Sequence, residues 1–111
     1  MTETKEFIDI AQDRQIRPVH PGEIIADILE DIGVSQTKLA QRLGISRRTV
    51  NEIIQGKRSI TVDTALRLGK AFGNGPRLWL NLQQKVDIWD ALQKHGGDYE
   101  QVKLLDPEHS L

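Results

Sequence analysis

The most constraining feature of the sequence is a pair of short amphipathic segments, residues 35–43 and 46–55, separated only by Gly44 and Ile45. Ser35 and Ser46 are suited to cap the starts of two helices, and Gly44 is suited to end the first of them. Because the connection is so short, the two helices must cross at a steep angle. Such a crossing needs a small residue at the contact, a residue that tolerates a positive φ at the corner, and apolar side chains in a shared core.

The sequence meets all of these requirements within the same short span. Ala40 supplies the small residue and Gly44 supplies the corner. The apolar positions that hold both helices to one core are Leu39, Leu43, Ile45, Val50 and Ile53. Because so many positions agree at once, the pattern predicts a helix-turn-helix over residues 36–55.

Helical periodicity extends over most of the remaining chain and predicts an all-α fold of five helices. The first helix begins near Pro21, carries Ile24, Ile25, Ile28, Leu29 and Ile32 at helical spacing, and ends at Gly33. The fourth follows a Thr61 cap and is expected to bury Val62, Ala65 and Leu66, with Phe72 as a further candidate. The fifth is the longest, from Pro76 to His95, just before Gly96 and Gly97. We therefore expect an N-terminal extension at 1–17, a helix-turn-helix domain at 18–95 and a C-terminal tail at 96–111, with short flexible ends.

Charge is distributed unevenly, although the formal net charge is only -1. Residues 35–58 carry six basic side chains and one acidic side chain, whereas residues 1–34 carry three basic and eight acidic ones. A cluster of this kind is often only the solvated surface of a helix. Here the positive charge coincides with the helix-turn-helix, which favours an anionic partner.

The outer face of the third predicted helix combines side chains that can read a DNA major groove. With Val50, Ile53 and Ile54 turned inward, the exposed residues are Arg47, Arg48, Asn51, Glu52 and Gln55. Arginine can pair with guanine, asparagine or glutamine with adenine, and glutamate with cytosine. For Glu52, an ion pair with Arg48 four residues earlier is an equally good explanation. For the arginines, helix solubility is the alternative.

Four further polar residues flank this face and are expected to contact the DNA backbone. Gln36 and Ser46 stand at helix starts, where main-chain amides commonly bind phosphate. Lys57 and Arg58 follow the third helix and can hold the flanking phosphates electrostatically.

The last predicted helix carries more apolar surface than one small domain can easily bury. Its main face comprises Leu78, Trp79, Leu82, Val86, Trp89 and Leu92, while Leu80, Ile88 and Ala91 lie away from it. One interpretation is that both tryptophans complete the monomer core. The other is a homodimer interface formed by Leu80, Ile88 and Trp89, because a twofold operator requires a dimer.

The span from Ile16 to Asp90 resembles the HigA group of antitoxins in the Xre family of helix-turn-helix proteins, which includes the phage Cro and C1 repressors. Ser35 to Gly56 carries the general Xre resemblance, and "HPGE", "TVDTALRL" and "WLNLQ" resemble HigA more narrowly. Gly75 and Arg77 depart from the family's usual residues, which affects only the local surface of the last helix.

The resemblance implies a compact lambda-repressor-like domain that forms a homodimer, binds double-stranded operator DNA and represses its own operon. It also implies neutralisation of a co-encoded HigB-type toxin, a RelE-like ribosome-dependent mRNA endonuclease. The family's DNA contacts would fall on Gln36, Ser46, Arg47, Arg48, Glu52, Gln55 and Lys57. A free-standing Xre repressor without a toxin remains the alternative function, and an adaptor that only binds proteins is a third one.

Catalytic, metal-dependent and membrane functions have little support in the sequence. The chain has no cysteine, and His20, His95 and His109 lack metal-ligand spacing. No nucleophile is paired with a base, so we expect no enzyme activity, no catalytic residues, no metal and no cofactor. Without a signal peptide or a membrane-spanning run, a cytoplasmic protein is expected.

The acidic N-terminal third, including Glu23, Asp27, Glu30 and Asp31 on the first helix, is the expected docking surface for a basic toxin.

Overall fold

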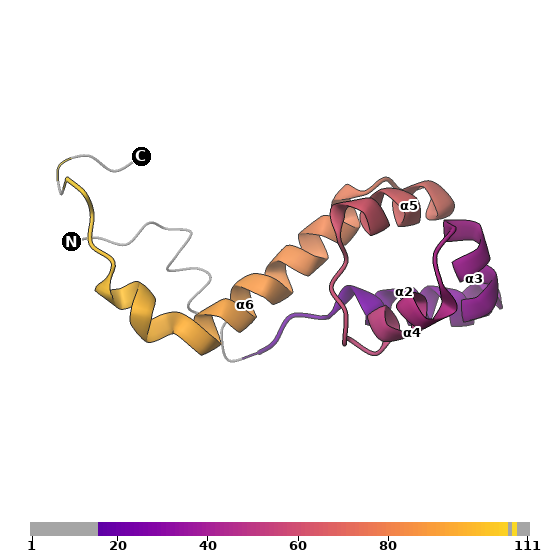
Figure 1. Cartoon of the computed structure of the whole chain (residues 1–111), viewed down its shortest axis with the longest axis horizontal. Coiled ribbons are helices and arrows are strands. Elements are labelled where there is room, and N and C mark those ends of the chain that lie inside the picture. Colours follow the sequence, from indigo (N-terminus) through magenta and orange to yellow (C-terminus); the bar gives the residue numbers. More distant parts are fainter. Residues whose placement is uncertain (1–15, 107, 109–111) are drawn as a thin grey trace. The chain divides into compact units, whose positions relative to one another are not determined.

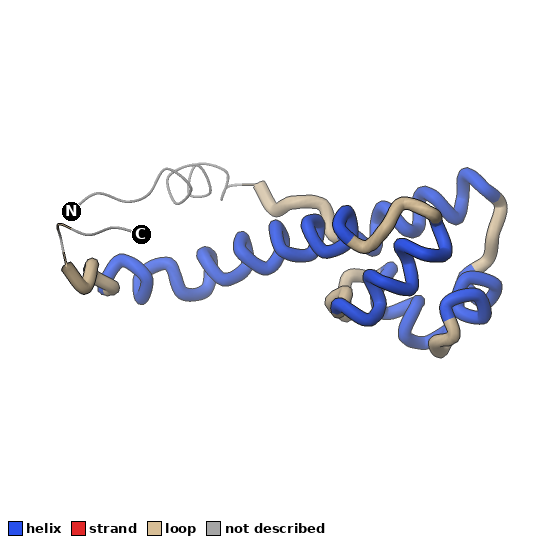
Figure 2. Tube along the Cα trace, turned by 90° about the horizontal axis from the view of Figure 1, so that it is seen from above, coloured by secondary structure: helices blue, strands red, loops and turns tan. Residues whose placement is uncertain are grey.

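The structure is a computed structural model that describes residues 16–106 and residue 108. These residues form helices and loops, and no strand occurs among them (Figure 2). The helices are α2 (Pro21–Ile32), α3 (Gln36–Leu43), α4 (Arg47–Ile54), α5 (Val62–Phe72) and α6 (Arg77–Gln101), labelled in Figure 1. The prediction of an all-α fold with five helices is therefore confirmed for this part of the chain. The predicted N-terminal extension lies almost entirely outside the described residues.

The chain divides into two compact units, of which the first comprises residues 18–86. This unit contains α2 to α5 and the first part of α6. The second unit includes Arg17 and the chain from Asp87 onward, where the Arg17 guanidinium makes two 3.1 Å hydrogen bonds to the Asp90 carboxylate. Within the described residues, no helix combines the length and apolar character that crossing a membrane requires.

Each of the first four helices begins at a side chain that accepts a hydrogen bond from a main-chain amide of its first turn. The Ser35 hydroxyl accepts from Lys38 N at 3.0 Å, Ser46 from Thr49 N at 3.0 Å, and Thr61 from Thr64 N at 3.2 Å. For α2 the cap is His20, whose Nδ1 accepts from Gly22 N at 2.9 Å. The Glu23 carboxylate completes a capping box by accepting from His20 N at 3.2 Å.

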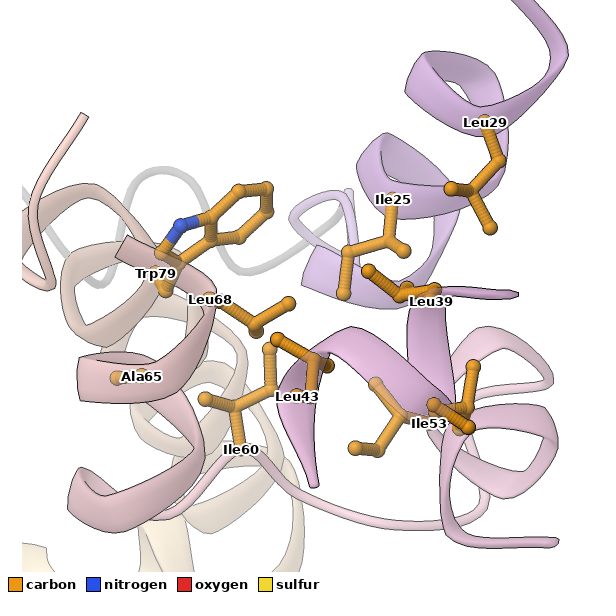
Figure 3. Packing of buried hydrophobic residues seen from close by; sticks show 11 residues of the cluster. Ile25, Leu29, Leu39, Leu43, Ile53, Ile60, Ala65, Leu68 and Trp79 are labelled. Atoms are coloured by element: carbon orange, nitrogen blue, oxygen red, sulfur yellow. The ribbon is translucent and has the colours of Figure 1, made fainter. Parts of the chain in front are cut away.

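The core of the first unit lies where these helices converge (Figure 3). Figure 3 shows Ile25 and Leu29 from α2, Leu39 and Leu43 from α3, and Ile53 from α4 pointing into a common interior. The interior is completed by Ala40, Val50, Ile60, Ala65, Leu68 and Trp79. Burying this cluster is the main source of stability, because each fully buried large apolar side chain contributes about 1.5–3 kcal/mol.

α2 and α4 approach each other so closely that only glycine fits at their contact. A Cβ atom placed on Gly22 would overlap the Ile53 carbonyl group of α4. At the corner between α3 and α4, Gly44 has φ 71°, in the left-handed region that favours glycine. The corner role of Gly44 is thus confirmed, and Ala40 is buried as expected.

Two polar side chains connect distant parts of the first unit. The Gln83 Oε1 atom accepts from Ile60 N at 2.8 Å, which joins α6 to the loop before α5. The Arg67 guanidinium donates to Leu43 O at 2.8 Å and to Asp63 Oδ2 at 2.9 Å. Arg67 therefore satisfies a carbonyl at the end of α3, next to the helix-turn-helix corner.

Two expectations about the buried face of α5 were wrong. On α5 the buried residues are Thr64, Ala65, Leu68 and Gly69, while Val62 and Leu66 are 62% and 54% exposed. The buried stripe is rotated by about one residue from the expected one, because the helix packs along its small residues. Ile32 is exposed because α2 ends there, at the Gly33 cap.

The last helix differs most from expectation. α6 continues through Gly96 and Gly97 to Gln101 rather than ending at His95. Glycine in a helix costs only about 1 kcal/mol relative to alanine. Here the flanking residues interact across the pair: His95 Nδ1 lies 3.2 Å from Asp98 Oδ2, and the His95 and Tyr99 rings are 6.2 Å apart. Leu78 is exposed and not part of a buried face, whereas Trp79 is fully buried.

We expect Gly22→Ala to destabilise the protein strongly, because the new methyl group meets main-chain atoms that cannot rotate away. The free energy of unfolding should fall by about 2 kcal/mol or more. Urea unfolding followed by circular dichroism measures this change. Gly96→Ala is the matched control, because a Cβ there meets no atom within 4 Å and alanine favours the helix. Equal stability of Gly22→Ala and the wild type would contradict the close contact between α2 and α4.

Candidate nucleic-acid interface

The candidate interface is built on α4 and on the start of α3, which Figure 1 shows next to each other. α4 is short and turns Val50 and Ile53 into the core. This leaves Arg47, Arg48 and Gln55 exposed, as expected from the sequence, whereas Asn51 and Glu52, which were also expected to be exposed, are half-buried. The packing of the core thus decides which side chains of α4 are presented to a partner.

The starts of α3 and α4 offer main-chain amides to an anion. The Ser46 hydroxyl accepts from the third amide of α4 and lies 2.8 Å from the Thr49 hydroxyl. The first two amides of a helix have no partner within the helix, and here they belong to the exposed residues Arg47 and Arg48. Ser35 caps α3 in the same way, which places Gln36 in its first turn. Both helix starts are therefore suited to phosphate.

Asn51 and Gln36 interact with each other. Asn51 Nδ2 donates to Gln36 Oε1 at 3.1 Å, and both residues are half-buried. This hydrogen bond joins the middle of α4 to the first turn of α3. It leaves the Gln36 amide group as a donor and the Asn51 carbonyl oxygen as an acceptor. The two residues act as a connected pair at the interface, which their separation in the sequence did not indicate.

Glu52 lies between two arginines. Its Oε1 atom is 3.1 Å from Arg48 Nε and 3.3 Å from Arg58 Nη2. The alternative of an ion pair between Glu52 and Arg48 is confirmed, and the contact with Arg58 was not anticipated. The Glu52 side chain is 25% exposed, whereas that of Arg48 is 88% exposed. Most of the Glu52 side chain is thus covered, whereas the Arg48 side chain extends into solvent.

The turn after α4 brings two basic residues close to the same face. Gly56 N donates to Ile53 O at 3.0 Å and Lys57 N donates to Glu52 O at 2.8 Å. Gly56 has φ 75°, which allows the chain to reverse before Lys57 and Arg58. Within residues 16–106, neither Arg47 nor Lys57 forms an ion pair. Positive charge on this surface is therefore only partly neutralised by the protein itself.

The residues expected at a dimer interface occupy different surroundings. Leu80 is half-buried and packs against the core of the first unit. Ile88 and Trp89 belong to the second unit and are also half-buried. The buried Trp89 Nε1 atom has no hydrogen-bond partner within the described part of the chain. Leu80 thus contributes to the monomer core, a role that was expected only for the main face of this helix.

The histidines of the described residues have structural partners. His20 caps α2, and His95 lies beside Asp98 and Tyr99. His109 is outside the described residues. No cluster of His, Cys, Asp or Glu within the described chain could hold a metal ion. Two contributions were not predicted from the sequence: the support of the α3 end by Arg67, and the pairing of Arg58 with Glu52. The four-residue spacing of Asp63 and Arg67 was a signal only for their mutual ion pair.

Comparisons with known proteins agree with this geometry. Residues 25–80 match the family model described as "Helix-turn-helix". Antitoxin HigA-1 of Vibrio cholerae is 38% identical over 90 residues, which cover 80% of this chain and 85% of that protein. The structure of an addiction module antidote protein of a HigA family from Coxiella burnetii is 47% identical with TM-score 0.75, covering 80% of this chain and 99% of that one.

The structure of a third relative includes DNA. The structure of Pseudomonas aeruginosa antitoxin HigA with the higBA promoter is 36% identical to this chain, with TM-score 0.75. The match covers 81% of this chain and 100% of that one. Taken with the geometry of α3 and α4, these matches show that the chain belongs to the HigA-type antitoxins of the Xre helix-turn-helix family.

Proposed function

We propose that this protein is a sequence-specific DNA-binding antitoxin that represses its own operon and neutralises a co-encoded RelE/HigB-like toxin. The DNA-binding part rests on the exposed face of α4, where Arg47 and Arg48 project from a helix that the core holds in place and Gln55 follows as its C-cap residue. The structure of the P. aeruginosa relative with the higBA promoter supports DNA binding. α4 would lie in the major groove.

Within this proposal the polar residues divide into two groups. Arg47, Arg48, Asn51, Glu52 and Gln55 lie on or beside the groove-facing side of α4 and bear on base recognition. The residues that contact the phosphates are Gln36, Ser46, Lys57 and Arg58. Phosphate contacts determine position and most of the salt dependence, whereas base contacts determine specificity.

Replacing Arg47 with alanine should weaken operator binding by about 1–3 kcal/mol and relax the preference for one base pair. Lys57→Ala should instead weaken binding to all sequences alike and lower the salt dependence of log K by about one unit. Fluorescence anisotropy with the DNA upstream of the reading frame, at several salt concentrations, distinguishes the two effects. Lys85→Ala, an exposed change on α6, is the control. Unchanged affinity in both test variants would show that α4 is not the binding face.

We further propose that the active form is a homodimer whose two α4 helices are about 34 Å apart, one turn of B-DNA. Its interface would involve the apolar surface around Leu80, Ile88 and Trp89. Ile88 is the best position to test, because Leu80 also packs against the monomer core.

Ile88→Glu should shift the protein toward monomer at micromolar concentration and weaken operator binding, because a dimer contacts two half-sites together. Sedimentation equilibrium measures the change in self-association. Gln93→Glu, an exposed change on another side of α6, controls for added charge. A wild-type protein that is monomeric at micromolar concentration would contradict the dimer.

The toxin-binding part of the proposal uses the acidic side of the molecule. Asp27, Glu30 and Asp31 are exposed on α2, and Glu23 is partly engaged in the capping box. A toxin that holds ribosomal RNA must present positive charge, so an acidic surface on the antitoxin would steer the encounter. We place the docking surface on this side of α2 and on residues 1–17.

Deleting residues 1–15, or changing Asp27, Glu30 and Asp31 together to alanine, should weaken binding to the purified product of an adjacent RelE-like reading frame. Operator affinity should stay unchanged, because these residues lie outside the basic segment. Calorimetry and anisotropy on the same preparations measure both interactions, with Asp63→Ala on α5 as a control. Unchanged toxin affinity in both variants would exclude this docking surface. Operator binding without any toxin binding would favour a free-standing repressor.

A further inference from the structure

The ion pairs of Glu52 point to a role beyond the cytosine contact that its residue type suggests. Glu52 is the only acid among residues 35–58, and one of its oxygens lies beside two guanidinium groups. Arg48 belongs to α4 and Arg58 to the loop that follows it. One carboxylate thus links a side chain on the groove-facing helix with a side chain next to that helix.

The atoms used in these contacts determine what remains available for DNA. Glu52 binds Arg48 through Nε, which leaves the two terminal nitrogens, the fork that pairs with guanine O6 and N7. It binds Arg58 through Nη2, which leaves Nη1 and Nε for a phosphate. The two arginines therefore keep different donor sets while sharing one carboxylate.

The exposed fractions of the three side chains indicate that Glu52 restrains the arginines. Only 25% of the Glu52 side chain is exposed, compared with 88% for Arg48 and 49% for Arg58. An arginine that is so exposed samples many rotamers unless something restrains it. Ion pairs of this exposed kind add little to folding stability, so their consequence is better sought in DNA binding.

We propose that Glu52 is a positioning residue that sets specificity by directing Arg48 to a base and Arg58 to the DNA backbone. This inference rests on the proposed DNA binding by α4. Without the carboxylate, both arginines would be free to contact the nearest phosphates. Affinity for unrelated DNA would then rise while discrimination between sequences falls.

The test is a selection from a randomised duplex library, carried out with the wild type, Glu52→Gln, Arg48→Ala and the double variant. The glutamine variant keeps the size of the side chain and removes its charge. We expect it to lower the ratio of affinities for the selected and a scrambled duplex on the order of tenfold. Its affinity for the scrambled duplex should be equal to or higher than that of the wild type. Glu52→Gln and Arg48→Ala should lose the preference for the same base.

The controls separate positioning from other roles. Asp63→Asn removes the matched pair of Asp63 and Arg67, also spaced by four residues and 2.9 Å apart, and should leave the base preference unchanged. The midpoint of thermal unfolding of Glu52→Gln should stay near that of the wild type. If Glu52→Gln still abolishes a base preference when Arg48 is already alanine, Glu52 reads that base itself and the inference is wrong. An unchanged affinity ratio in Glu52→Gln would also overturn it. If the wild type binds no duplex of any sequence, the proposed DNA binding is wrong, and the inference about Glu52 is wrong with it.

Discussion

The contact between α2 and α4 is the constraint on which the rest of the first unit depends. Main chain meets main chain where Gly22 faces the Ile53 carbonyl, so α4 is held at a distance that side chains cannot vary. With the axis of α4 fixed, Val50 and Ile53 enter the core and the arginines of the same helix remain outside. The surface proposed to read DNA is thus a consequence of how the opposite side of α4 packs.

Most of the fold of residues 18–86 could be predicted because its signals are local. Ser35, Ser46 and Thr61 each cap a helix through an amide three residues later. Gly44 forms a corner that its place between two amphipathic segments indicates. Apolar periodicity then identifies the inward side of α2, α3 and α4. The exposed positions of Arg47 and Arg48 follow from the same periodicity, so that part of the interface was accessible from the sequence.

The remaining features depend on contacts between distant residues. On α5, Leu66 and Leu68 are equally apolar, and only the approach of neighbouring elements decides that Leu68 is buried. At Gly96 and Gly97 the flanking helical interactions outweigh the preference of glycine for a break. The bond between Asn51 and Gln36 joins residues 15 positions apart, and no pairing rule within one helix anticipates it.

Arg67 has a consequence for whether the DNA-reading motif can be moved to another protein. Its guanidinium satisfies the Leu43 carbonyl from outside the motif, so residues 36–55 do not contain everything that fixes their own corner. A graft of this segment alone would return that carbonyl to water and loosen the angle between α3 and α4. A segment that is moved to another protein must therefore extend at least to Arg67. Otherwise the receiving protein must supply a hydrogen-bond donor for the Leu43 carbonyl.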